Sequence, residues 1–96
     1  MKSKLFGKKC LVTGASRGIG KSIVRRLLES DAVVIASASN NEGLTALQAE
    51  FSNFSQNLIT IRADLSLTSD VDMLCKSVTT AVGNIDILIN NAGILH

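Results

Sequence analysis

Residues 10–20 read Cys-Leu-Val-Thr-Gly-Ala-Ser-Arg-Gly-Ile-Gly, a turn with three glycines that directly follows an apolar run. An amphipathic pattern begins within the turn, with apolar residues at the three- and four-residue spacing of a helix: Ile19, Ile23, Val24, Leu27 and Leu28. Strand, glycine turn and helix in this order are typical of a site for the phosphates of a dinucleotide. Glycine permits the sharp turn and leaves room for a phosphate against the main chain. The free N–H groups of the helix start face the same place.

Outward from this turn, the hydrophobic pattern predicts that four strands alternate with three helices. We expect strands at 9–13, 32–36, 58–61 and 85–89, and helices at 18–30, 41–51 and from the Thr68 and Ser69 region to Val82. Thr68 or Ser69 is the expected N-cap of the third helix, and Gly83 is its expected stop. Because every connection carries a helix, the strands should be parallel with right-handed crossovers. The fold class is therefore an α/β, doubly wound parallel sheet of the order β-α-β-α-β-α-β.

Small or polar residues follow all four predicted strands. They are Gly14–Gly20, Ser37–Asn40, Asp64 and Asn90–Gly93. In parallel sheets, ligands bind beyond the carboxyl ends of the strands, near the point where the strand order reverses. The four segments together therefore predict one binding site at this edge of the sheet.

Size and composition restrict the class of protein. A chain of 96 residues with 46% apolar residues is expected to form one small domain. The net charge of +2 and the three aromatic residues argue against nucleic-acid or membrane partners. Two cysteines without paired spacing indicate reduced thiols, so we expect a cytoplasmic protein, with a mitochondrion or another organelle as the alternative. No metal site is expected. The Lys2, Lys4, Lys8 and Lys9 cluster is interpreted as a solvated terminus rather than a binding patch.

Two motifs carry a family resemblance. Thr13 to Gly20 fits the pattern Thr-Gly-x3-Gly-x-Gly, and Asn90 to Gly93 reads Asn-Asn-Ala-Gly. With these motifs the chain resembles the short-chain dehydrogenase/reductase family over essentially its whole length, and within it the 3-oxoacyl-acyl-carrier-protein reductases. The resemblance implies a Rossmann-type fold that binds a nicotinamide dinucleotide. The predicted cofactor-binding residues are Thr13, Gly14, Ser16, Arg17, Gly18, Ile19, Gly20, Ser37, Ser39, Asp64, Leu65, Asn91, Ala92 and Gly93.

The resemblance also implies roles for some of these residues. Gly14 would allow the turn, Gly18 the approach of the pyrophosphate, and Gly20 the packing of helix against strand. The backbone of Ile19 would contact the phosphate or nicotinamide end. Asp64 would accept a hydrogen bond from the adenine amino group with Leu65 beside it, or else it caps the local backbone. The ribose would lie against Asn91, Ala92 and Gly93, whereas Asn90 can be purely structural.

The choice of cofactor can be argued from charge. An NAD enzyme usually places Asp or Glu about 20 residues past the glycine turn, where it binds the ribose 2′-OH. Here the second strand ends in Ala-Ser-Ala-Ser-Asn (36–40), without a carboxylate. Ser37 and Ser39 can donate hydrogen bonds to a 2′-phosphate, and Arg17 can supply the matching charge. We therefore expect NADP rather than NAD.

The family's catalytic chemistry has no match in these residues. The resemblance implies hydride transfer to or from a small carbonyl or alcohol substrate, with a Ser, a Tyr-x3-Lys pair and an Asn that lie beyond the fourth strand. The 96 residues contain no tyrosine, and no catalytic residue is predicted. The chain is interpreted as residues 1–96 of a truncated Rossmann domain, the cofactor-binding portion of an oxidoreductase. The alternative is a non-catalytic dinucleotide-binding module or short isoform that pairs with a longer relative. The resemblance also implies a homo-oligomer, the usual assembly of this family.

Overall fold

The computed structural model describes residues 2–91. Within this range, strands and α-helices alternate, with one short 3-10 helix after the second α-helix. Their bounds are β1 (Lys9–Thr13), α1 (Gly18–Glu29), β2 (Val33–Ala38), α2 (Asn41–Glu50), η1 (Ser52–Phe54), β3 (Leu58–Arg62), α3 (Thr68–Val82) and β4 (Ile87–Asn90).

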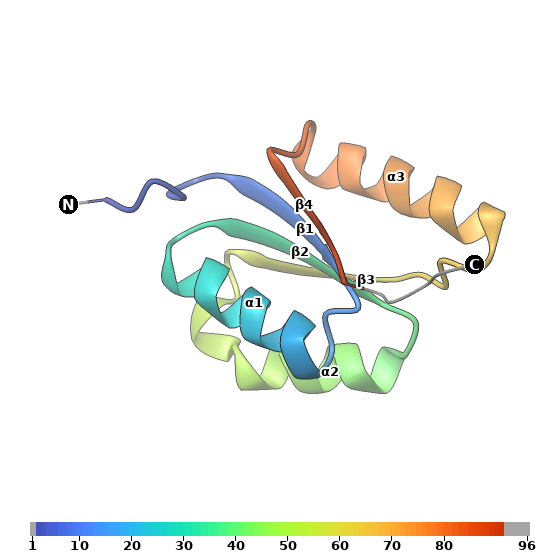
Figure 1. The fold of residues 1–96 in the computed structure, drawn as a ribbon, viewed down its shortest axis with the longest axis horizontal. Coiled ribbons are helices and arrows are strands. Elements are labelled where there is room, and N and C mark those ends of the chain that lie inside the picture. Colours follow the sequence, from blue (N-terminus) through green and yellow to red (C-terminus); the bar gives the residue numbers. More distant parts are fainter. Residues whose placement is uncertain (1, 92–96) are drawn as a thin grey trace.

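The four strands form one parallel sheet in the order β3-β2-β1-β4. Helices α1 and α2 cover one face, and α3 covers the opposite face (Figure 1). This arrangement confirms the predicted doubly wound parallel sheet. The strand order reverses at β1, which pairs with β2 on one side and with β4 on the other. The carboxyl end of β1, where the glycine turn begins, therefore lies at the point where parallel sheets bind ligands.

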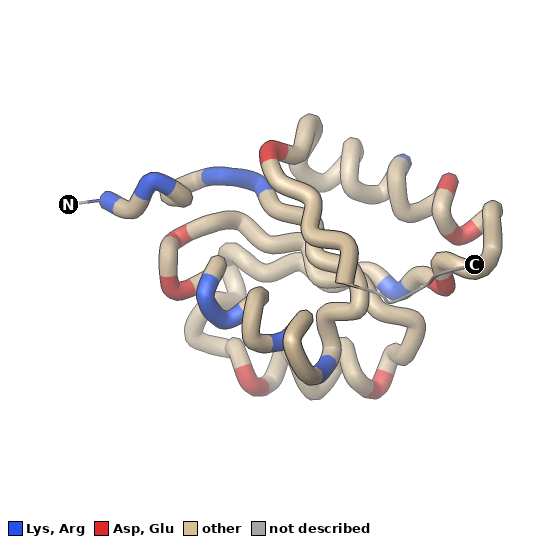
Figure 2. The backbone as a smooth tube through the Cα atoms, in the orientation of Figure 1, with Lys and Arg blue, Asp and Glu red and all other residues tan. Residues whose placement is uncertain are grey.

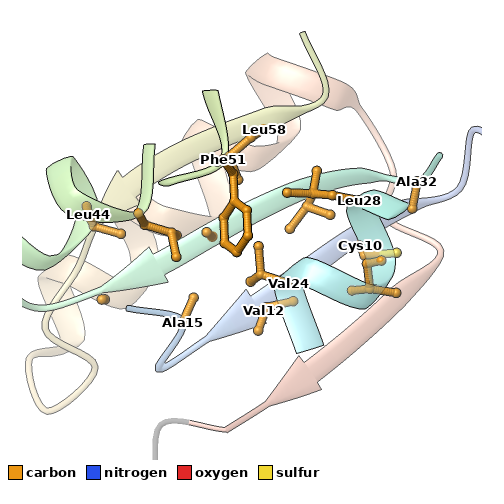
Figure 3. Close-up of a cluster of buried hydrophobic side chains, with 14 residues drawn as sticks. Cys10, Val12, Ala15, Val24, Leu28, Ala32, Leu44, Phe51 and Leu58 are labelled. Atoms are coloured by element: carbon orange, nitrogen blue, oxygen red, sulfur yellow. The ribbon is translucent and has the colours of Figure 1, made fainter. Parts of the chain in front are cut away.

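The sheet buries apolar side chains on both faces. The larger cluster lies under α1 and α2, where the ring of Phe51 packs among aliphatic side chains that include Val24 and Leu58 (Figure 3). The smaller cluster lies under α3, with Ile35, Leu74 and Val78. Val24 belongs to the apolar stripe that the helical spacing predicts for the first helix.

The first helix departs from the predicted stripe at one position. Val24, Leu27 and Leu28 are buried, but Ile19 is 71% exposed. It stands in the first turn of α1, directly after the glycine turn that follows β1. Ile19 therefore belongs to the rim of the strand-end region rather than to the core.

The limits of β2 and β4 and the cap of α3 differ most from the prediction, whereas the ends of α1, α2 and β3 differ by one residue each. β2 is Val33–Ala38 and β4 is Ile87–Asn90, both displaced toward the carboxyl end, because Lys9 pairs with Val33 and Cys10 with Ile87. Pairing with β1, rather than local composition, sets these limits. The N-cap of α3 is Leu67, which has no capping side chain, so the expectation of a Thr68 or Ser69 cap was wrong. Gly83 ends α3 with a φ of 78°, as predicted.

Candidate functional site

The carboxyl ends of the strands surround a cleft of about 750 Å³. Its walls come from the glycine turn, the β2–α2 loop, the segment after β3 and the residue after β4, so the structure brings together the segments that the sequence predicts. The lining residues are Thr13, Gly14, Ser16, Arg17, Gly18, Ser37, Ala38, Ser39, Asn40, Gly43, Ala63, Asp64, Leu65 and Asn91.

The helix that follows the glycine turn presents an uncapped N-terminus. Its N-cap residue, Arg17, makes no side-chain capping hydrogen bond, and the first turn of α1 holds no acidic residue. The N-terminus of α2 differs, because Asn40 Oδ1 accepts hydrogen bonds from the N–H groups of Glu42 and Gly43 at 2.7 and 3.1 Å. An anion in the cleft therefore finds free backbone donors and a positive helix end at α1.

The glycines of the turn meet two physical requirements, a left-handed backbone and a close approach of α1 to β1. Gly14 and Gly18 have φ values of 60° and 61°, in the left-handed region that side chains other than glycine rarely adopt. A Cβ at Gly18 would meet no atom within 4 Å, so this residue leaves its side of the cleft open. A Cβ at Gly20 would overlap the Gly14 carbonyl and lie 2.7 Å from Asn91 Nδ2. Gly20 thus lets α1 pack against the end of β1.

Hydrogen bonds tie the end of β1 to the end of β4. Thr13 Oγ1 donates to Asn90 Oδ1 at 2.9 Å and accepts from the N–H of Asn91 at 3.0 Å. Asn91 Nδ2 donates to the carbonyl of Gly14 at 3.2 Å. The side chain of Asn90 is thereby engaged in holding the strands together, which fits a structural role, and Asn91 is fixed at the wall of the cleft.

The end of β2 carries no carboxylate, and its two serines are not equivalent. Ser39 is exposed in the β2–α2 loop, and Arg17 is exposed in the glycine turn. Ser37 is only 1% exposed, and its buried Oγ has no hydrogen-bond partner among residues 2–91. Ser39 and Arg17 can therefore meet a large anion directly, whereas the Ser37 hydroxyl lies beneath the surface of the cleft.

Asp64 is the acidic residue of the cleft lining. Its Oδ1 accepts from the N–H and the hydroxyl of Ser66 at 3.0 and 2.6 Å, the local capping that the sequence left as an alternative. The hydrogen bonds from Ser66, and next the positive charge of Arg62, hold the pKa of the Asp64 carboxyl below its usual range. The carboxylate is therefore ionised at neutral pH and acts as an acceptor. Leu65, next to it, packs against the apolar cluster under α3.

Of the predicted site residues that the structure describes, Ile19 and Gly20 are not part of the lining. Both lie in the first turn of α1, where Ile19 borders a second hollow together with Ile23 and Leu27. Ala92 and Gly93 fall outside the described residues.

The cleft also contains Gly43 and Ala63, which the sequence reasoning missed, and Ala38 and Asn40, which lie in the predicted segment Ser37–Asn40 but were not among the predicted cofactor-binding residues. Gly43 is the most informative, because a Cβ there would lie 2.8 Å from Ser16 Cβ and 3.0 Å from Ser16 Oγ. The absence of a Cβ at Gly43 lets the glycine turn approach α2. A glycine inside a helical pattern costs about 1 kcal/mol relative to alanine, which is the signal that could have identified it.

Within residues 2–91, no helix has the length and apolar character needed to cross a membrane.

Comparison with known proteins places this geometry in a family. The family model described as short chain dehydrogenase matches residues 8–96. The chain is 38% identical over 91 residues to 3beta-hydroxysteroid dehydrogenase 2 of Eggerthella lenta, covering 95% of this chain and 35% of that protein. It is 39% identical over 90 residues to the 3-oxoacyl-[acyl-carrier-protein] reductase of Vibrio cholerae, covering 94% and 36%. The chain thus spans about a third of the length of these relatives.

A solved structure agrees with the sequence relatives. The NADP active-site complex of RhlG from Pseudomonas aeruginosa superimposes with a TM-score of 0.85 at 37% identity, covering 94% of this chain and 36% of that one. The alternation of strands and helices described above is thus shared with a relative whose structure contains NADP.

Proposed function

Because the chain belongs to the short-chain dehydrogenase family, whose members bind a nicotinamide dinucleotide, we propose that its strand-end cleft binds NADP(H). The observation that carries the proposal is the pairing of an uncapped α1 N-terminus with a β2 end that lacks a carboxylate. The first feature suits a pyrophosphate. The second removes the group that would bind the ribose 2′-OH of NAD and repel the 2′-phosphate of NADP.

The lining residues fit the parts of this cofactor. The backbone of Gly18, Ile19 and Gly20 would hold the pyrophosphate, since a Cβ at Gly18 would occupy the open side of the turn. Arg17 and Ser39, exposed on two sides of the cleft, would hold the 2′-phosphate, and Asp64 with Leu65 would border the adenine. Asn91, with Ala92 and Gly93 after it, would border the ribose next to the nicotinamide.

We assign the chain to a reductase that acts on a carbonyl. The two relatives named above act on a hydroxysteroid and a 3-oxoacyl group, as their names state. Each of these reactions interconverts a carbonyl and an alcohol. When bound, the cofactor supplies or accepts the hydride of such a reaction. This chain contributes the binding and orientation of the cofactor; a 3-oxoacyl-type carbonyl is the substrate class that we propose.

Binding of the two cofactors tests the proposal without any assay of activity. We expect the protein to bind NADPH at least about tenfold more tightly than NADH in titration calorimetry, a difference of about 1.4 kcal/mol. Arg17→Met should remove most of this preference and leave NADH affinity unchanged. Arg25→Met is the matched control, because Arg25 is also an exposed arginine of the α1 region but pairs with Glu50 outside the cleft. Equal or tighter binding of NADH would contradict the choice of cofactor.

A non-catalytic dinucleotide-binding module is the second candidate, because the 96 residues contain no tyrosine to transfer a proton. The two candidates differ in one assay. If the chain is part of a reductase, the full-length protein should oxidise NADPH when a 3-oxoacyl thioester is added. If the full-length protein binds NADPH but turns over no carbonyl, the non-catalytic binding module is favoured.

A further inference from the structure

Arg62, the last residue of β3, connects two loops beside the cleft. Its Nε donates to the carbonyl of Ser39 at 3.1 Å, and its Nη1 donates to Asp70 Oδ2 at 3.3 Å. The same Asp70 oxygen accepts from the N–H of Asp64 at 2.8 Å. Basic and acidic positions accordingly lie close together where β3 ends and α3 begins (Figure 2). A continuous chain of contacts therefore runs from the β2–α2 loop to the segment after β3.

Sheet pairing places Arg62 where it can make these contacts. Ala38, the residue before Ser39, is the register partner of Arg62, and the N–H of Ala63 donates to the Ala38 carbonyl at 3.0 Å. β2 ends at this point, so the ladder of sheet hydrogen bonds does not fix Ser39. The guanidinium of Arg62 holds Ser39 instead, because its planar group of N–H donors can donate to two acceptors at once.

The contact orients the peptide group between Ser39 and Asn40. In a planar trans peptide, the carbonyl and the following N–H point in opposite directions. The carbonyl of Ser39 faces Arg62, so the N–H of Asn40 points away from it. Within residues 2–91, the N–H groups of Ser39 and Asn40 have no hydrogen-bond acceptor, and both residues line the cleft. The loop thus keeps two backbone donors available to an anion.

We propose that Arg62 is a positioning residue for 2′-phosphate recognition, which it controls by holding the Ser39 carbonyl so that the Ser39–Asn40 donors face the ligand. This inference rests on the proposed function and names a determinant of its specificity. Arg62 acts through the loop rather than on the cofactor, because it is not among the lining residues and its charge is paired with Asp70. Its loss should therefore weaken the 2′-phosphate contact alone.

NADPH and NADH are the probes, since they differ only in the 2′-phosphate. For Arg62→Met we expect the dissociation constant of NADPH to rise about tenfold, while that of NADH changes less than about twofold. Arg25→Met is again the matched control: the two side chains are 49% and 46% exposed, each pairs with a carboxylate, and each substitution removes one positive charge. Both dissociation constants of the control should equal those of the wild type.

Arg62→Lys separates positioning from charge. Lysine keeps the positive charge near Asp70 but lacks the rigid fork that reaches two acceptors, so we expect the same selective loss of NADPH affinity. Full wild-type affinity in this variant would show that charge alone matters and would overturn the inference. The lysine variant also serves if the methionine variant does not fold, which circular dichroism reports.

The remaining outcomes are distinguishable. An unchanged NADPH:NADH ratio in Arg62→Met overturns the inference and leaves the proposed function intact. If the dissociation constants of NADPH and NADH rise equally, Arg62 has only a general structural role, and the inference is also overturned. A wild-type protein that binds neither cofactor refutes the proposed function, and the inference with it.

Discussion

Gly20→Ala tests whether the fit between α1 and β1 is as tight as the structure shows. The added Cβ would overlap the carbonyl oxygen of Gly14 and lie 2.7 Å from Asn91 Nδ2. The Gly14 atom is backbone, so rotation of a side chain cannot relieve the overlap, and α1 has to move away from the strand. Overpacking of this kind costs about 3 kcal/mol at the upper end of its usual range. Alanine recovers about 1 kcal/mol as the better helix former. A net loss of about 2 kcal/mol remains.

The assay is thermal unfolding followed by circular dichroism. For a domain of this size, each kcal/mol shifts the midpoint by about 4–8 °C, so Gly20→Ala should lower it by roughly 8–16 °C. Gly18→Ala is the control from the same turn. Its Cβ would meet nothing within 4 Å, but the φ of 61° costs roughly 1–2 kcal/mol for alanine. A midpoint for Gly20→Ala within about 2 °C of the wild type would refute the packing argument.

Three further predictions concern the rest of the site and the core. Thr13→Val removes the hydroxyl that links Asn90 and Asn91 and should lower the free energy of unfolding by about 1–3 kcal/mol in urea titrations, so an unchanged value would contradict the role of Thr13 in joining β1 to β4. The lowered pKa of Asp64 means that its ionised form stabilises the fold above the pKa of the unfolded chain and that this contribution is lost as the pH falls through the folded pKa. The stability difference between wild type and Asp64→Asn should therefore be largest near neutral pH and shrink as the pH falls through the folded-state pKa of Asp64; a difference that grows toward acid pH would contradict this sign. Burial raises the pKa of the Cys10 thiol, whereas Cys75 is exposed. A thiol reagent at neutral pH should therefore modify Cys75 alone until denaturant is added, and mass spectrometry of the native protein checks this.

The sequence predicted the elements that depend on local pattern. The helical spacing of Val24, Leu27 and Leu28 and the apolar run of β1 are properties of neighbouring residues, and the structure agrees with both. The limits of β2 and β4 depend instead on pairing with β1, which no local pattern contains. The cap of α3 was also mispredicted. The helix starts after Leu67 without a capping side chain, and the nearby Asp70 Oδ2 accepts hydrogen bonds from the N–H of Asp64 and from Arg62, which local pattern does not reveal.

The site shows the same division. The glycine turn and the segments after the strands could be recognised because their positions follow from chain order in a parallel sheet. The contact of Gly43 with Ser16 joins residues 27 positions apart, and that of Arg62 with Ser39 joins residues 23 positions apart. The burial of the Ser37 hydroxyl depends on which face of β2 it occupies relative to α3. Such relations appear only when the sheet is assembled.

The most direct test of the central claim is a titration with NADPH followed through backbone amide signals in nuclear magnetic resonance spectra. The account predicts that the largest shifts occur at Gly18, Ile19 and Gly20, with shifts at Ser39 and Asn40 that NADH does not produce. Residues farther along α1, such as Arg25, which pairs with Glu50, should change little. Absence of saturable shifts, or shifts centred away from the glycine turn, would contradict the assignment of this cleft as a dinucleotide site.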